Sequence, residues 1–188
     1  MVLGGVVLGL SLRIPPGSAW FYPATLALAA VWFAGAYVAG PVGLGPGRPV
    51  LLPIAMGGLL VGVFVLGSLV VRQVSFLDGP VRDVADHAAR GSWPLLVLVT
   101  AVTGVAEELF FRGAAYDAAP RRPVLVTTTA YGVATLASGN LLLAFAAVVL
   151  GAVVGLERRR YGAVLAPILT HCTWSLAMLF LLPVLFQG

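Results

Sequence analysis

Three ionisable residues stand close together inside an apolar stretch of the sequence. Glu107, Glu108 and Arg112 lie within the run from Pro94 to Tyr116, which consists mainly of hydrophobic residues. A charge at the centre of a bilayer costs about 2.5–3.5 kcal/mol on insertion scales, so ionisable groups inside a membrane segment point by default to a function. We therefore interpret this segment as the centre of a catalytic site.

The spacing of these groups predicts separate roles on one helix. Glu108 and Arg112 are four residues apart, so they can form an ion pair on one face, with the glutamate on the preferred N-terminal side. Consecutive helical residues point about 100° apart, so Glu107 lies on a different face, which is small and polar enough to line a hydrated cavity. The other members of that face are Thr100, Thr103, Gly104 and Phe111. The alternative is a structural ion pair, with Glu107 hydrogen-bonded to a neighbouring helix.

The composition predicts the fold class. The chain has 188 residues, of which 60% are hydrophobic and 10% charged, and its mean hydropathy is +1.03. Such values are typical of an integral membrane protein. We predict an all-α fold, a polytopic transmembrane helical bundle that forms a single membrane-embedded domain over residues 1–188. We expect this domain to reside in the plasma membrane of a bacterium.

Apolar runs separated by Gly, Pro and Arg residues predict six to seven membrane spans and one short interfacial helix. The first run, Met1–Leu12, is short for a full crossing. The other predicted spans are Ala19–Ala39, Val50–Val71, Pro94–Tyr116, Pro123–Ala137, Leu141–Leu156 and Gly162–Phe186. The interfacial helix lies between Arg72 and Trp93, and its apolar stripe consists of Val81, Val84, Ala85 and Ala88. In the span from Val50, Gly58 and Gly62 would let a neighbouring helix approach closely.

The distribution of arginine predicts the orientation of the bundle. With seven spans, one set of loops, at residues 48, 121–122 and 158–160, holds six arginines, and the other set, at 13 and 72–90, holds four. The positive-inside rule places the first set in the cytoplasm. Glu107 and His171 then lie about ten residues, or ~15 Å, from the cytosolic ends of their helices. We expect the two side chains to face one cavity that opens to the cytosol.

Several other classes of function find little support in the sequence. No basic patch with interleaved aromatic residues suggests nucleic-acid binding, and we predict none. Adjacent carboxylates diverge on a helix and one histidine makes a poor zinc site, so we predict no metal and no other cofactor. The only cysteine, Cys172, lies in an apolar span, so there is no disulfide framework, and we interpret it as a small buried core residue.

Four motifs follow one another within residues 94–178, which we define as the motif-bearing core. They are Glu107-Glu108-xxx-Arg112, Tyr131-Gly132-Val133-Ala134, Asn140-Leu141-Leu142 with Gly151 and Gly155, and Ala166-Pro167-Ile168-Leu169-Thr170-His171. In residue type and order these motifs resemble the CPBP family, which contains CAAX-prenyl proteases and bacteriocin-processing membrane proteins.

This resemblance implies an all-helical intramembrane endopeptidase. It implies that Glu107 is the general base that activates water, that Glu108 and Arg112 are a supporting ion pair, and that His171 stabilises the oxyanion. The implied partners are the lipid bilayer and a peptide or membrane-protein substrate that enters from the cytosol or the bilayer. A membrane partner subunit would join them if a second chain supplies a missing histidine. The positions in supporting roles are Tyr131, Thr135 and Ser175.

Two of these positions differ from the family pattern. Thr135 stands where the second motif has histidine, and Ser175 stands where the third motif has asparagine. Threonine cannot act as a base, and serine is a shorter hydrogen-bond donor than asparagine. Three functions therefore compete: the endopeptidase, a catalytically inactive relative that binds a membrane partner or peptide in the same cavity, and a small carrier or channel with Glu107 as its proton or cation site.

Overall fold

The computed structural model describes residues 2–40, 43, 45 and 50–187, without the side chains of residues 75–78 and 187. Within these residues the regular secondary structure is entirely helical. The elements are α1 (Val2–Ser11), α2 (Phe21–Ala39), α3 (Leu51–Val71), α4 (Ser75–Arg90), α5 (Trp93–Glu108), η1 (Leu109–Ala114), α6 (Ala115–Ala118), α7 (Pro123–Leu136), α8 (Leu141–Tyr161) and α9 (Leu165–Gln187). Arg48, which entered the predicted orientation, lies outside the described residues.

Five helices of the described chain are long and apolar enough to cross a membrane. They are α2, α3, α8, α9 and the continuous helix Trp93–Ala118, which comprises α5, η1 and α6. Two more apolar helices are shorter, α1 with 10 residues and α7 with 14. At 1.5 Å per residue α7 extends about 21 Å, less than the ~30 Å hydrocarbon core of a bilayer. The predicted polytopic helical bundle is confirmed, and its six to seven spans correspond to five full-length helices and these two short ones.

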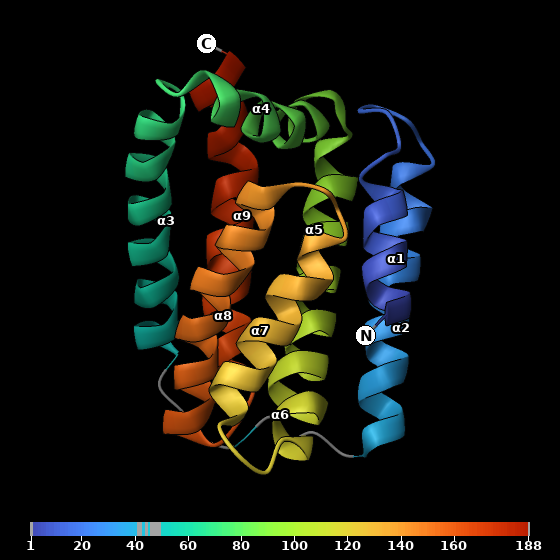
Figure 1. The fold of residues 1–188 in the computed structure, drawn as a ribbon, viewed down its shortest axis with the longest axis vertical. Helices are drawn as coiled ribbons and strands as arrows, with labels where there is room; N and C mark the ends of the chain where they lie inside the picture. Colours follow the sequence, from blue (N-terminus) through green and yellow to red (C-terminus); the bar gives the residue numbers. More distant parts are fainter. Residues whose placement is uncertain (1, 41–42, 44, 46–49, 188) are drawn as a thin grey trace.

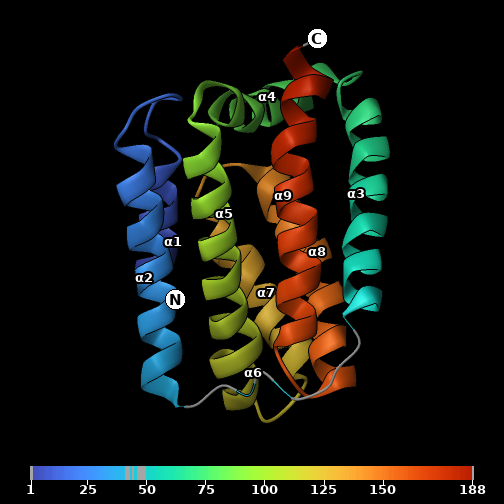
Figure 2. The same ribbon diagram turned by 180° about the vertical axis from the view of Figure 1, so that it is seen from behind.

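The long helices stand side by side, and α4 lies crosswise over one end of them (Figure 1). Seen from behind, α5 and α9 occupy the middle of the bundle, with α2 beside α5 and α3 beside α9 (Figure 2). On the opposite side α7 packs against α8. The turn between α6 and α7 and the C-terminal end of α8 lie at the end of the bundle opposite α4 (Figure 1). The fold thus has an α4 end and an opposite end, and the motifs lie between them.

The predicted short helix is present as α4, and it is tied to three other parts of the chain. The Arg82 guanidinium donates to the Phe186 carbonyl at 2.6 Å, and the Asn140 side-chain amide donates to the Pro80 carbonyl at 2.7 Å. A ring nitrogen of His87 lies 2.8 Å from the Ile14 carbonyl oxygen. Ala85 and Ala88 of its apolar stripe are buried, while Val81 and Val84 line a cavity beneath the helix. The stripe therefore faces the interior of the bundle.

Helix α8 is longer than the sequence predicted. We expected it to end at Leu156 and the arginines at 158–160 to lie in a loop, but the helix continues to Tyr161. It ends at Gly162, whose φ of 69° is the left-handed conformation that glycine adopts readily. The three arginines occupy the last turn, where positive charge complements the helix dipole.

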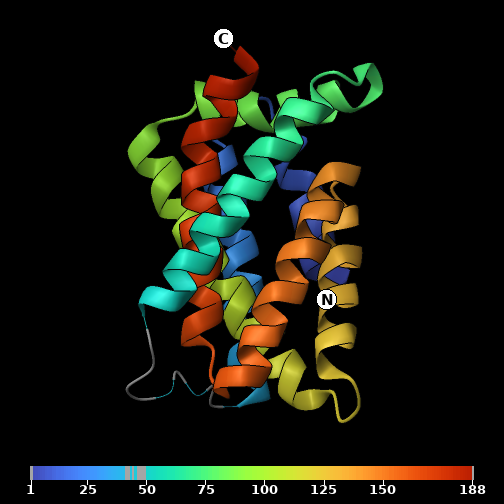
Figure 3. The same cartoon turned by 90° about the vertical axis from the view of Figure 1, so that its left-hand side faces the viewer.

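The close contact between α3 and α9 involves a different glycine from the expected pair. A Cβ atom added to Gly58 or Gly62 would meet nothing within 4 Å, so the prediction that these two residues face a neighbouring helix is wrong. At Gly57 an added Cβ would lie 2.7 Å from Cβ of Thr173 and 2.8 Å from the Thr170 carbonyl oxygen. Helix α3 thus approaches α9 through its N-terminal half, and it runs at an incline to α7 (Figure 3).

Aromatic side chains hold the motif-bearing helices against α2. The Trp32 ring of α2 packs on Phe110 and Phe111 of η1, with ring centroids 4.8 and 5.0 Å away. The Phe111 ring in turn packs on Tyr131 of α7 at 4.9 Å. Trp32, Phe111 and Tyr131 are all buried, so this cluster fixes the positions of η1 and α7.

Candidate active site

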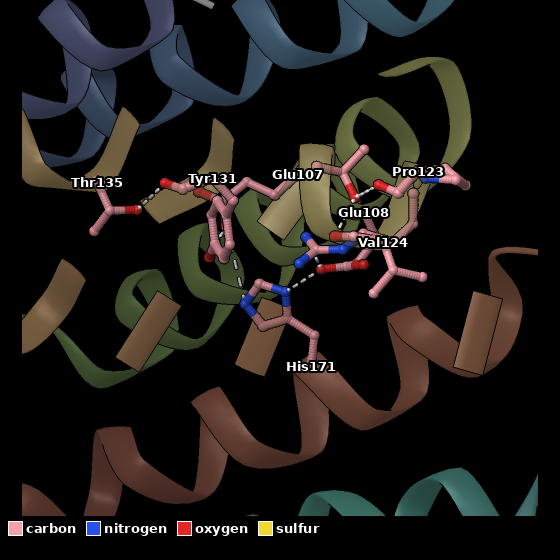
Figure 4. Close-up of polar contacts among 9 residues, drawn as sticks. Glu107, Glu108, Pro123, Val124, Tyr131, Thr135 and His171 are labelled. Atoms are coloured by element: carbon pink, nitrogen blue, oxygen red, sulfur yellow. Dashed lines mark hydrogen bonds and ion pairs between the residues drawn. The ribbon is translucent and has the colours of Figure 1, made fainter. Parts of the chain in front are cut away.

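Four predicted site residues meet in the middle of the bundle (Figure 4). Glu107 and Glu108 come from α5, Tyr131 from α7 and His171 from α9. All four are buried; Glu107 is 8% exposed and Glu108 is fully enclosed. The matched depth that the sequence predicted for Glu107 and His171 is therefore realised, and the chain places two carboxylates beside one imidazole.

Glu107 is held by a hydrogen bond from a neighbouring helix. The Tyr131 hydroxyl donates to Oε2 of Glu107 at 2.7 Å. Nε2 of His171 lies 4.0 Å from the same oxygen (Figure 4). A separation of 4.0 Å accommodates a water molecule that is hydrogen-bonded to both atoms, because each such bond is about 2.8 Å long. The second oxygen of the carboxylate is left for the cavity.

Glu108 is enclosed by two partners on the same oxygen. Nη1 of Arg112 donates to Oε1 of Glu108 at 3.0 Å, and Nδ1 of His171 lies 2.8 Å from that oxygen. The side chains of Glu108 and Arg112 are 0% exposed, and the guanidinium lies over the Tyr131 ring, 4.9 Å from its centroid. The predicted ion pair is present. The bond between Glu108 and His171 was not predicted, because the sequence does not say which face α9 presents to α5.

Two glycines lie against this arrangement. A Cβ at Gly104, one turn before Glu108, would lie 3.4 Å from Sγ of Cys172 and 3.7 Å from the His171 ring, which are ordinary contact distances, so α9 lies close to α5 here. A Cβ at Gly151 of α8 would lie 2.9 Å from Nη2 of Arg112. Gly151 thus provides the space that the buried guanidinium fills.

The helix that carries the glutamates changes its winding directly after them. Residues Leu109–Ala114 form the π-helical segment η1, and the Ala115 amide donates to the Phe110 carbonyl, five residues earlier. Such insertions into α-helices are frequent at functional sites. Arg112 lies inside this segment and still reaches Glu108. Regular helical spacing, assumed from the sequence, therefore applies up to Glu108 and not beyond it.

An apolar cavity of about 540 Å³ adjoins the site. Glu107 and His171 lie on its wall, together with Thr103, Gly104 and Ser175. Most of its other lining residues are hydrophobic and come from α3, α4, α8 and α9. Val63 of α3 and Phe145 of α8 line the cavity and are more than half exposed, 52% and 60%, so its rim reaches the outer surface between these two helices.

The cavity extends towards the α4 end of the bundle. On α5 its lining residues all precede Glu108, and on α9 they begin at His171 and continue to Leu182. The two helices are antiparallel, so both sets lead towards α4 (Figure 2). The arginines at 121–122 and 158–160 lie at the opposite end. The expectation that the cavity opens on the same side as these arginines is therefore wrong, because a count of loop charges does not indicate which half of a bundle is hollow.

The side chains at the two positions that differ from the family pattern form no hydrogen bond with Glu107, Glu108 or His171. The Thr135 hydroxyl donates to the Tyr131 carbonyl of its own helix at 2.9 Å and points away from His171 (Figure 4). Thr135 is also absent from the residues that line the cavity. Ser175 does line the cavity, and its hydroxyl has a long hydrogen bond of 3.5 Å to the Cys172 carbonyl.

One buried carboxylate near the site was missed by the sequence interpretation. Glu157, which directly precedes the arginines at 158–160, is 8% exposed and accepts a hydrogen bond from Thr170 at 2.8 Å. The Thr170 hydroxyl also lies 3.0 Å from the Pro53 carbonyl oxygen. Glu157 thus connects α8 to the residue before His171. A signal was present in the sequence, because Glu157 follows the apolar Val154 by three residues and so shares its helix face.

The charged groups of the site contact one another, but Oε2 of Glu108 and Nε and Nη2 of Arg112 have no hydrogen-bond partner among the described residues. Among the described residues no group of three or more His, Cys, Asp and Glu side chains is arranged to hold a metal ion. Tyr131 bonds to Glu107 and Arg112 bonds to Glu108, while His171 lies beside both carboxylates. The arrangement can position a water molecule between Oε2 of Glu107 and Nε2 of His171, at the wall of an apolar cavity.

These features define a polytopic helical membrane protein with a buried glutamate and histidine site beside an apolar cavity. Residues 89–177 match the family model described as type II CAAX prenyl endopeptidase Rce1-like. That segment contains all four motifs, and it belongs to the family of CAAX-protease-like membrane endopeptidases, which confirms the resemblance stated from the sequence. The comparisons with curated proteins and with solved structures gave no match.

Proposed function

We propose that this protein is an intramembrane endopeptidase in which Glu107 activates a water molecule to attack a peptide bond. The observation that carries the proposal is the position of the Glu107 carboxylate. It lies on the cavity wall, is oriented by the Tyr131 hydroxyl at 2.7 Å, and faces Nε2 of His171 at 4.0 Å. A positioned general base typically contributes 10² to 10⁴ in rate.

The proposed reaction assigns each proton to a stated atom. Glu107 takes a proton from water, and the resulting hydroxide attacks the carbonyl carbon of the scissile bond. The oxyanion accepts a hydrogen bond from Nε2 of His171; since Nδ1–H is donated to Glu108, this step requires the doubly protonated ring. The proton held by Glu107 then passes to the leaving nitrogen as the C–N bond breaks. Glu108 and Arg112 act as positioning residues for His171.

The test is cleavage of a peptide library by purified protein in nanodiscs, with fragments identified by mass spectrometry. The library contains peptides with apolar C-terminal segments, each with and without an isoprenyl group. Glu107→Gln should reduce cleavage at least 100-fold without a change in the melting temperature. Glu157→Gln is the matched control, because Glu157 is equally buried and does not line the cavity. Equal cleavage by the wild type and Glu107→Gln would refute the proposal.

We further propose that the cavity opens to the cytosol, which places the α4 end on the cytosolic side and reverses the orientation that the distribution of arginine predicted. Single-cysteine variants in a Cys172→Ser background test this: Gly79→Cys on α4 and Arg121→Cys at the opposite end. Both positions are exposed, and a Cβ at Gly79 meets nothing within 4 Å. A membrane-impermeant maleimide added to intact cells should label position 121 and leave position 79 unlabelled. The reverse pattern would place the cavity on the outer side.

A second candidate function is a catalytically inactive relative that binds a peptide in the same cavity. It is favoured by Thr135, whose hydroxyl is bound to its own helix, and by Ser175, whose hydroxyl bonds only weakly. The variant Thr135→His distinguishes the two functions, provided that its melting temperature matches that of the wild type. A gain of Glu107-dependent cleavage would support the endopeptidase. Peptide binding without any cleavage, in both wild type and Thr135→His, would support the inactive relative.

A further inference from the structure

A second cavity, of about 630 Å³, lies between α7 and α8. Its walls are mainly apolar and include Val124, Leu125, Ala152 and Leu156. Leu125 and Leu156 are 57% and 55% exposed, so this groove opens on the outer face of the bundle. It lies near the start of α7 and the end of α8, at the end of the bundle opposite α4 (Figure 1). We refer to it as the α7–α8 groove; it shares no residue with the cavity beside Glu107.

The mouth of the α7–α8 groove carries positive charge. Arg122 and Arg159 line it together with Tyr116, and no acidic residue does. The guanidinium of neither arginine forms an ion pair or hydrogen bond with the described residues, whereas that of the neighbouring Arg158 pairs with Asp117 at 2.7 Å. Two exposed guanidinium groups thus stand beside an apolar surface without a protein partner.

The backbone at the mouth adds to this positive character. Arg122 has φ 51° and ψ 48°, a left-handed conformation that arginine rarely adopts and that is further disfavoured before Pro123. No side chain caps the N-terminus of α7, so the first-turn amides of Val124 and Leu125 have no partner within the helix. The positive end of the helix dipole therefore lies at the same point as the two arginines.

We propose that the α7–α8 groove binds an anionic phospholipid. The phosphate would accept hydrogen bonds from Arg122 and Arg159, and an acyl chain would lie along Leu125, Ala152 and Leu156. A phospholipid supplies both chemistries at the depth where a membrane helix ends, and basic pockets between membrane helices bind anionic head groups in this way. The site rests on different residues from those of the proposed peptidase, so it stands whether or not the chain is active.

Native mass spectrometry of delipidated protein tests the proposal by comparing phosphatidylglycerol with phosphatidylcholine of the same acyl chains. We expect one tightly bound phosphatidylglycerol and no comparable phosphatidylcholine. The double variant Arg122→Gln with Arg159→Gln should lower the affinity for phosphatidylglycerol about 30-fold, because each arginine near an anionic surface contributes roughly fivefold to the affinity. Changing both arginines to lysine should restore most of the affinity, which also shows that the site tolerates substitution.

The matched control is the double variant Arg121→Gln with Arg160→Gln, which removes the same charge at the same end without touching the groove. This control should bind phosphatidylglycerol like the wild type. Ala152→Phe, which fills the groove and leaves the charges in place, should also lose the bound lipid. Equal losses in the control and the groove variants, equal binding of both lipids, or displacement of the lipid by inorganic phosphate alone would overturn the proposal.

Discussion

Glu107 and Glu108 are adjacent in the sequence but lie in two different environments. Around Glu107 the carboxylate has one hydrogen bond, from Tyr131, and borders a cavity. Around Glu108 the carboxylate is fully enclosed and one of its oxygens serves both Arg112 and His171. The first arrangement leaves an oxygen available to react, and the second uses the charge for position. A single step along the helix, a rotation of about 100°, thus separates a group held for chemistry from a group held for structure.

The largest effect is expected when the enclosed ion pair of Glu108 and Arg112 is broken. Arg112→Met removes the partner of a carboxylate that has no access to water, and loss of one member of a buried ion pair costs about 3–5 kcal/mol. Thermal or denaturant unfolding in detergent should show this loss. Adding Glu108→Gln to Arg112→Met should recover part of it, because the unpaired charge is then removed. A stability equal to that of the wild type for the single variant would contradict the enclosed ion pair.

A smaller effect is expected when the hydrogen bond to Glu107, beside the cavity, is removed. Tyr131→Phe deletes the hydroxyl that orients Glu107, a bond to a charged group worth about 1.5–3 kcal/mol. Because Glu107 borders the cavity and can take a water in its place, the loss should appear mainly as a tenfold to 100-fold slower cleavage. The measurement is the rate of cleavage beside the melting temperature. A large drop in melting temperature with unchanged cleavage would assign Tyr131 to structure.

The third prediction compares two adjacent glycines of α3. Gly57→Ala should destabilise the fold by about 1–3 kcal/mol, because the added methyl group meets Thr173 and the backbone of Thr170 and must push α3 away from α9. Gly58→Ala, whose methyl group meets nothing within 4 Å, should leave stability almost unchanged. Unfolding of the two variants under the same conditions gives the difference directly. Equal stabilities would mean that α3 does not approach α9 at Gly57.

The sequence predicted those parts of the site that depend on local geometry. The ion pair of Glu108 and Arg112 follows from their spacing, and the matched depth of Glu107 and His171 follows from the fixed rise of a helix. The helical fold followed from the apolar runs, although α1 and α7 are shorter than full spans. None of these predictions requires knowledge of how one helix is rotated against another.

The features that the sequence did not predict depend on such rotations. His171 reaches Glu108 only because α9 turns that face to α5 at Gly104. Gly57 and Gly58 are equally small, and only the packed bundle decides which of them touches α9. The position of the open end of the cavity likewise depends on how α3 and α8 diverge beneath α4, and the distribution of charges in the sequence does not predict this position.

The π-helical segment η1 also determines where this helix can lose a residue. It separates Glu107 and Glu108 from Tyr116 and Asp117, which contact Arg158 at the end of α8. Deleting Gly113 would let the wide turn close to a regular α-helical turn, so Tyr116 and Asp117 would keep nearly their present direction towards Arg158. A deletion in the regular α-helix before η1 would instead turn the two parts of the helix against each other by about 100°.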